Sequence, residues 1–162
     1  MELLTLNRKV LALKDDIRDW NIRQKERLIL RYNELGFKAS GNWEKDLTPT
    51  QDVMPFNIRI RMEGSDYTYY MINGRKAGGK FPPVGKIRQW IKDKGITPTG
   101  NITINQLTYL ISRKIAVEGI TPSPERKRLL LDVYDRQSKE ELFDLIRKNM
   151  IFDIQDKLKK IL

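Results

Sequence analysis

The segment at residues 74–80 carries the residue types in this sequence best suited to bind phosphate. Its sequence, GRKAGGK, matches the G-x-x-x-x-G-K half of a P-loop, in which backbone amides and a lysine bind nucleotide phosphates. The match ends at Phe81, where a P-loop has the Ser or Thr that holds magnesium. Pro82 and Pro83 also keep the loop from running straight into a helix whose N-terminus would face the phosphates. We therefore expect a loop that is mobile or ordered by a partner, with no nucleotide and no cofactor.

Basic residues are concentrated between residues 75 and 94, where seven of them stand against one acid, Asp93. They are Arg75, Lys76, Lys80, Lys86, Arg88, Lys92 and Lys94. Such a patch suits contact with DNA phosphates, which is salt-dependent and reads no sequence. It also suits a solvated face or the basic half of a protein interface. We favour these last two, because aromatic residues placed to stack on bases are limited to Phe81 and Trp90, and we expect Trp90 to lie in the core.

Two groups of carboxylates could in principle bind magnesium or transfer protons. They are Asp15, Asp16 and Asp19, and Glu140, Glu141 and Asp144. Each group lies among turns rich in Lys and Arg, and the second falls in the first turn of its helix, where acids oppose the helix dipole. The chain has no His and no Cys, which removes thiolate nucleophiles, most zinc sites and the best proton carrier near neutral pH. We expect no enzymatic activity, no catalytic residue and no metal.

Composition indicates a soluble globular protein in a polyanionic setting. A chain of 162 residues with 40% hydrophobic and 32% charged residues suits one compact core, with or without an appended helical arm. The net charge of +10 favours DNA, an acidic protein surface or a membrane face, and charge alone does not choose among them. No apolar run approaches the ~20 residues that cross a bilayer, and the start lacks a signal peptide. We expect folding in a cytoplasm.

A long N-terminal helix is predicted over residues 5–35. One apolar stripe runs along it at alternating spacings of four and three, made of Leu6, Val10, Leu13, Ile17 and Trp20. Gly36 stands where a left-handed C-terminal cap is expected. Such a helix is about 45 Å long, which is more than a small core can cover. We therefore expect the stripe to pack against another copy of the chain.

A small antiparallel sheet is predicted to follow. Residues 56–62 alternate Phe56, Ile58, Ile60 and Met62 with polar residues, which indicates a half-buried strand. Residues 63–66 suit a hairpin turn, and residues 67–72 are aromatic and β-branched enough to form the returning strand. A weaker strand is expected over residues 43–53, interrupted at Pro49. The sheet would have about three strands.

The rest of the chain reads as helices. The first runs from Val84 to Gly95, and the second has a capping box at Thr103 and Gln106 and ends at Gly119. Its predicted buried face is Ile104, Leu107, Ile111 and Ile115. Ser123 and Pro124 begin a helix that continues to about Tyr134. Ser138 and Glu141 suggest a capping box for the last helix, whose apolar stripe is Leu142, Ile146, Met150, Ile154, Leu158 and Ile161. The fold class is α+β: a long N-terminal helix packed on a small antiparallel β-sheet, followed by several helices.

Four segments in order resemble the neck and tail-completion proteins of tailed bacteriophages. They are KASGNW (38–43), YYMINGR (69–75), PPVGKIRQWIKDKGI (82–96) and LISRKIAVEGITP (110–122). They correspond to the family's Ser-Gly-Asn turn, its tyrosine-rich strand, its Pro loop and Trp helix, and its basic helix before a Gly and a Pro. The chain departs from the family at Asn73, where an acid is common, and at Ser123-Pro124-Glu125, where an aromatic is common.

The resemblance implies a structural virion protein without enzymatic activity. Protomers would form a ring at the head–tail junction, by contact with copies of themselves and with other neck, portal or tail proteins. Residues 1–122 would be the tail-completion-like domain and residues 123–162 a helical extension. The side chains expected to reach an adjacent ring or the DNA path are Arg75, Lys76, Lys80, Phe81, Lys86 and Arg88. The alternative is a small basic protein that binds DNA without sequence specificity; a nuclease or nucleotide hydrolase is disfavoured.

Overall fold

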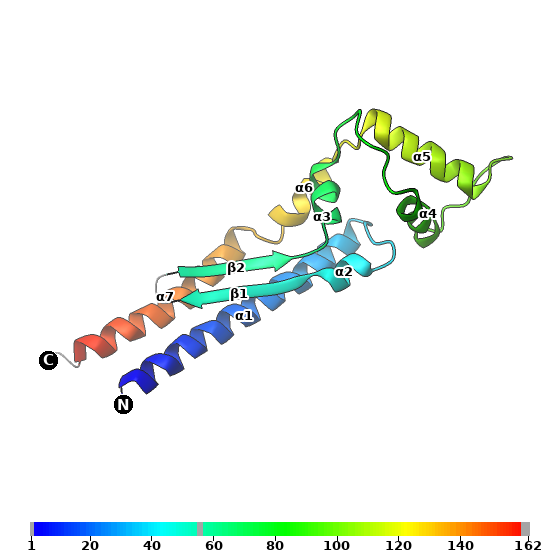
Figure 1. Ribbon diagram of the computed structural model, residues 1–162. Coiled ribbons are helices and arrows are strands. Elements are labelled where there is room, and N and C mark those ends of the chain that lie inside the picture. The colour runs from blue at the N-terminus through cyan, green and yellow to red at the C-terminus, as the bar shows by residue number, and fades with distance from the viewer. Residues whose placement is uncertain (1, 55–56, 160–162) are drawn as a thin grey trace. The chain divides into compact units, whose positions relative to one another are not determined.

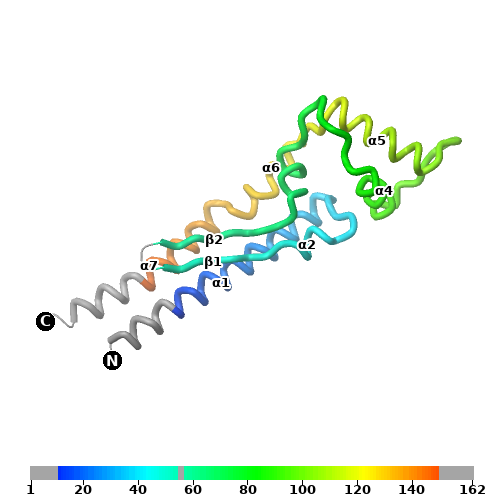
Figure 2. Tube along the Cα trace, viewed as in Figure 1, coloured from blue at the N-terminus to red at the C-terminus, as the bar shows by residue number. Residues whose placement is uncertain are grey.

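The chain folds into two compact units. The computed structural model describes residues 2–54 and 57–159, with side chains over 11–54 and 57–149. Unit 1 is built from residues 1–31, 47–63 and 130–162, and unit 2 from residues 32–46 and 64–129. Figures 1 and 2 trace the chain through both units. The expected α+β class is confirmed, because a long N-terminal helix and a small antiparallel sheet are followed by several helices. The boundary at residue 122 stays a prediction.

The described elements are seven helices and two strands. In chain order they are α1 (Glu2–Glu34), α2 (Asn42–Asp46), β1 (Thr48–Met54), β2 (Asn57–Glu63), α3 (Tyr67–Asn73), α4 (Val84–Asp93), α5 (Ile104–Glu118), α6 (Pro124–Leu131) and α7 (Arg136–Lys159). Helix α1 thus has the extent that its periodicity predicts. Gly36 follows it with φ +68°, in the left-handed region that suits a glycine cap.

Unit 1 has a two-stranded antiparallel sheet beside α1. Strands β1 and β2 pair in a register that places Thr50 opposite Arg61. Asn21 of α1 is fully buried, and its Nδ2 donates to the carbonyl oxygens of both residues, at 3.2 and 3.1 Å. One amide therefore ties the helix to both strands. The apolar core beside it is formed by Ile17, Trp20, Leu28, Leu47 and Val133.

The predicted strand at residues 67–72 is wrong, because these residues form helix α3. Its sequence, YTYYMIN, has strand propensity, but the surroundings decide the outcome. Only Met71 is buried, and Trp43 Nε1 donates to Thr68 Oγ1 at 2.9 Å, so one side of a helical turn packs against α2. The hairpin turn predicted at residues 63–66 is also wrong, since those residues lead into α3.

The other strand expectations are partly met. β2 has the predicted alternation, with Ile58, Ile60 and Met62 half-buried; Phe56 lies outside the described residues. Its partner β1 begins at Thr48 and runs through Pro49 without interruption. Trp43 belongs to helix α2 instead of a strand. The described sheet has two strands where about three were expected.

Most predicted helix ends are confirmed. Thr103 and Gln106 form a reciprocal capping box at the start of α5, and Gly119 ends that helix with φ +76°. Helix α6 begins at Pro124 as expected but stops at Leu131, short of Tyr134. The buried centre of α5 also differs. Thr108, Ser112 and Ala116 are buried, whereas the predicted face of Ile104, Leu107, Ile111 and Ile115 is half-buried, so small residues let α5 pack closely.

The predicted capping box at Ser138 is wrong by three residues. Helix α7 begins at Arg136, and the side chain of Asp135 accepts a hydrogen bond from the Ser138 backbone N–H at 2.7 Å. Asp135 is therefore the N-cap, and Ser138 lies buried inside the first turn. The distal stripe residues Met150, Ile154, Leu158 and Ile161 lie outside the described side chains.

Unit 2 has its own aromatic core. The rings of Tyr32 and Trp43 stack with centroids 4.2 Å apart, and Phe37 meets Tyr32 edge-on at 6.0 Å. Burial, with the nearby Tyr67 and Glu44, raises the pKa of Tyr32 to about 12. Helices α4 and α5 pack on one another, with Ile91 fully buried in α4. The two parts of unit 2 are joined by the Trp43–Thr68 hydrogen bond and by Lys94, which donates to the carbonyl of Gly36.

Candidate interaction surface

The basic loop at residues 75–81, called the cationic loop below, is fixed along helix α5. Arg75 and Ile120 exchange two backbone hydrogen bonds, of 2.9 and 2.8 Å. The amide of Gly78 donates to the carbonyl of Val117 at 3.3 Å. Arg75, Gly78 and Phe81 of the loop therefore contact, in that order, Ile120 just after α5 and then Val117 and Tyr109 within it. A loop expected to be mobile or partner-ordered has a defined path.

Two glycines allow this close approach. Gly119 has φ +76°, and a Cβ there would stand 2.3 Å from the carbonyl oxygen of Arg75. Gly74 has φ +72°, and its Cβ would stand 2.1 Å from the carbonyl oxygen of Ile120. A side chain at either position would collide with backbone and occupy a strained conformation. The crossing of the loop over the end of α5 thus depends on both.

The predicted basic residues lie mostly in solvent. Lys76, Lys80, Lys86, Arg88 and Lys92 are exposed, and none of them forms an ion pair with a described side chain. Arg75 is half-buried, and its guanidinium donates to the carbonyl of Lys80, which braces the loop. Lys94 is also half-buried and donates to the carbonyl of Gly36 at 2.9 Å. Of the seven cations, two therefore form hydrogen bonds within unit 2, and five are exposed and can contact another molecule.

The structure adds residues that the sequence analysis missed. Tyr109, Arg113 and Val117 repeat at a spacing of four along α5, so they share one face of the helix. Phe81 stacks on Tyr109 with centroids 6.1 Å apart and planes at 27°, and the two side chains are 50% and 54% exposed. Arg113 is exposed and lies one helical turn from both Tyr109 and Val117. The i, i+4 spacing of these residues was the available signal.

Trp90 is 36% exposed, so its expected place in the core is wrong. Helix α4 buries Ile91 completely, and the adjacent position along the helix points about 100° away from it. Ile91 is the buried residue of this ten-residue helix, and Trp90 lies at the edge of the packed face.

Five of the six carboxylates that could have formed a catalytic pair, all except Glu141, contact a cation or an amide in the described part of the chain. Arg18 pairs with Asp15 at 2.8 Å and with Asp19 at 3.2 Å, and Asn149 donates to Asp16. On α7, Arg136 pairs with Glu140 and Arg147 with Asp144, at 2.6 and 2.7 Å. Within the described ranges, no three His, Cys, Asp or Glu side chains come together as a group that could hold a metal ion.

The predicted packing stripe of α1 is mostly used inside unit 1. Ile17 and Trp20 are buried and Leu13 is half-buried, while the side chains of Leu6 and Val10 lie outside the described ones. Other apolar side chains of the same helix are exposed: Leu11 by 57%, Ile22 by 38% and Leu30 by 61%. At 100° per residue these three fall within an arc of about 100°, which also holds the exposed acids Asp15, Asp19 and Glu26. This side of α1 is therefore mixed, with three exposed apolar side chains among charged ones.

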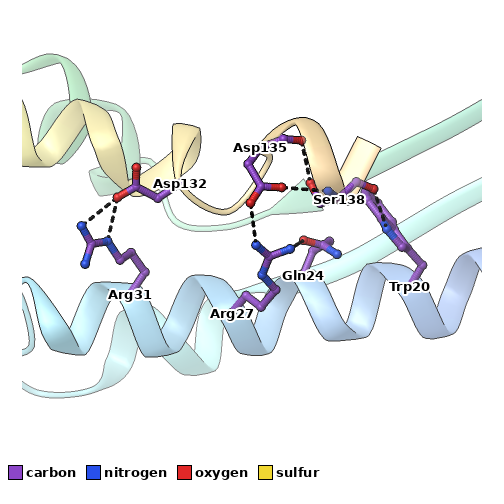
Figure 3. A network of polar contacts seen from close by, with 7 residues as sticks. All are labelled: Trp20, Gln24, Arg27, Arg31, Asp132, Asp135 and Ser138. Atoms are coloured by element: carbon purple, nitrogen blue, oxygen red, sulfur yellow. Dashed lines mark hydrogen bonds and ion pairs between the residues drawn. The ribbon is translucent and has the colours of Figure 1, made fainter. Parts of the chain in front are cut away.

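A polar network fixes α1 to the start of α7 (Figure 3). Trp20 Nε1 donates to the carbonyl of Ser138 at 3.1 Å, and Arg27 pairs with Asp135 at 3.1 Å. One turn further on, Arg31 pairs with Asp132 at 2.7 Å. The hydrogen bond from the Ser138 backbone, helped by Arg27, lowers the pKa of Asp135. The network ties α1 to the segment that begins α7, within unit 1.

Comparison with known proteins identifies no relative: no family model, no curated protein and no solved structure matches this chain significantly. In the described part of the chain, none of the helices combines the length and the apolar character needed to span a bilayer.

Proposed function

We propose that this chain is a structural subunit of a tailed phage, which forms or joins an oligomeric ring at the head–tail junction by protein–protein packing. The observation that carries the proposal is the set of large apolar side chains left exposed on two helices, Leu11, Ile22 and Leu30 on α1 and Tyr67, Tyr69 and Tyr70 on α3. Scattered single apolar residues are normal in monomers, but neighbouring ones such as Tyr67 and Tyr70, one turn apart, are typical of an interface.

Unit 2 also carries exposed aromatic and aliphatic side chains. On α3 they are Tyr67, Tyr69 and Tyr70, and on α5 the side chain away from the cationic loop is Leu110. A ring needs two different complementary patches on each protomer, because its interface is heterologous. The exposed apolar residues of α1 and those of unit 2 are the candidates for these two patches.

The four segments that resemble neck and tail-completion proteins supply the biological setting. All four lie in unit 2, and three of them, YYMINGR, the Pro loop with its Trp helix, and the basic helix before Gly119, adjoin the cationic loop. The short distances between the described carboxylates and cations also fit a protein whose charged groups stabilise its fold.

The test is the location of the chain in particles. Virions of the phage that encodes it are purified, their proteins are identified by mass spectrometry, and a C-terminally tagged copy is labelled with gold for negative-stain imaging. We expect label at the head–tail junction. Absence of the protein from mature virions, or label confined to the capsid shell, would overturn the proposal.

A further inference from the structure

Positive charge is unevenly distributed along the chain. Residues 75–128 contain twelve Lys and Arg but three Asp and Glu, whereas unit 1 contains 17 of the former and 14 of the latter. The cationic loop, α4 and α5 thus account for most of the net charge of +10. Such an imbalance in one unit indicates a polyanionic partner.

Three unpaired cations lie along one strip of unit 2. Lys76 and Lys80 belong to the cationic loop, which follows α5 from Ile120 through Val117 to Tyr109. Arg113 lies on α5 between Tyr109 and Val117, on the face that these two residues share. Two glycines and two backbone hydrogen bonds hold the loop in this path. The strip is therefore a formed surface, with its charged side chains exposed and without ionic partners in the described part of the chain.

The chemistry of the strip favours phosphates over an acidic protein. Lysine is depleted from the buried centres of protein interfaces, and lysines predominate here, with Lys86 and Lys92 on the adjoining α4. A single-stranded nucleic acid would need open aromatic faces for its bases. Phe81 and Tyr109 instead stack on each other, and a duplex presents the higher density of phosphate charge.

We propose that Lys76, Lys80 and Arg113 bind the phosphate backbone of duplex DNA without reading its sequence. The inference is separate from the ring proposal, because it concerns the purified chain and needs no assembly. The contacts are charge pairs between exposed side chains and phosphate oxygens, so each neutralised phosphate steepens the dependence of log K on log salt concentration by about 0.9.

The test measures binding of the full chain to a fluorescent 20-base-pair duplex by anisotropy, from 50 to 300 mM salt. In the triple variant Lys76→Gln, Lys80→Gln and Arg113→Gln, we expect the slope to become shallower by about 2.7. The variant Lys76→Arg with Lys80→Arg keeps the charges and should keep the wild-type slope. Circular dichroism and the thermal midpoint verify that every variant is folded.

A matched control removes the same charge from unit 1. Arg23, Lys139 and Lys148 are exposed, and none of them has an ionic partner among the described side chains. Their triple substitution by Gln should leave the slope unchanged. Equal losses in both triple variants would show that net charge alone acts, which overturns the site. Tighter binding of a 20-base single strand than of the duplex, or an unchanged slope in the first variant, would overturn the proposal as well.

Discussion

Asn21 joins three elements of unit 1 through one side chain. Its Nδ2 reaches a carbonyl of each strand, while its Oδ1 is buried with no hydrogen-bond partner in the described part of the chain. An asparagine in the middle of an amphipathic helix carries no sequence signal for such a role. Periodicity marks Ile17 and Trp20 as buried, but the partner of a buried polar residue depends on the tertiary structure.

Replacing Asn21 by Ala should lower the free energy of unfolding by about 1–2 kcal/mol, because two part-buried carbonyls lose their donor. Urea denaturation followed by circular dichroism measures the change. The same substitution at Asn33, exposed in the same helix, is the control and should change the stability by less than about 0.5 kcal/mol. Equal effects at the two positions would contradict the role of Asn21.

Asp135→Asn should alter how stability depends on pH. The carboxyl has a lowered pKa in the folded chain, so it contributes stability above its ordinary value of 3.8 and loses that contribution as the pH falls through the lowered pKa. Asn keeps a capping oxygen for the Ser138 amide but cannot ionise. The urea midpoint of wild type should therefore exceed that of the variant at pH 6, and the gap should narrow as the pH falls below 3.8.

Arg27→Gln is the companion variant, since it removes the ion pair and leaves the cap. We expect it to reproduce only part of the midpoint difference, because the Ser138 hydrogen bond is the larger cause of the lowered pKa. A difference between wild type and Asp135→Asn that stays constant from pH 6 to pH 3 would show that ionisation of Asp135 does not contribute.

At the scale of elements, sequence patterns predicted the long and periodic segments best. Helices α1, α4 and α5 follow from apolar repeats with caps at their ends, and β2 follows from its alternation. Helix α3 was missed because its tyrosines favour a strand, while the decisive contacts, Trp43 to Thr68 and the burial of Met71, come from elsewhere in the chain. The basic character of the cationic loop could be predicted from the sequence. Its path along α5 could not, because that path depends on backbone contacts between distant positions.

Gly119→Ala should destabilise the crossing between the cationic loop and α5. The new Cβ would stand 2.3 Å from the Arg75 oxygen at a positive φ, so we expect a loss of at least about 2 kcal/mol in chemical denaturation. Gly85→Ala is the matched control, because nothing lies within 4 Å of its Cβ and it sits in helix α4. That change should raise stability by roughly 0.5 kcal/mol. A loss at Gly85 equal to that at Gly119 would contradict the crowded crossing.

At the scale of the whole molecule, the two units differ in what they offer to other molecules. Unit 1 is nearly balanced in charge and exposes Leu11, Ile22 and Leu30 on α1, whereas unit 2 holds most of the net positive charge. The composition gives the total charge, but how that charge is distributed between the two units follows only from the structure. The same holds for α1, whose predicted stripe lies partly in the core.

The triple variant Leu11→Ser, Ile22→Ser and Leu30→Ser should lose self-assembly. We expect oligomers of wild type in native mass spectrometry and monomers of the variant, with unchanged circular dichroism, because all three side chains are exposed. Phe143→Ser, which removes a 61% exposed ring from α7, is the control and should still assemble. A monomeric wild type, or loss of assembly only in the control, would contradict the assignment of the contact to α1.

The interleaving of the two units also determines the order in which they can be completed during translation. Trp20 cannot form its hydrogen bond to Ser138, 118 residues further along the chain, until that residue has been synthesised. At synthesis rates of about 5–20 residues per second, that interval lasts roughly 6–24 s. Unit 2 can close while the third segment of unit 1 is still being made. The nascent chain therefore carries an unfinished unit 1 for seconds, because α1 is synthesised well before α7.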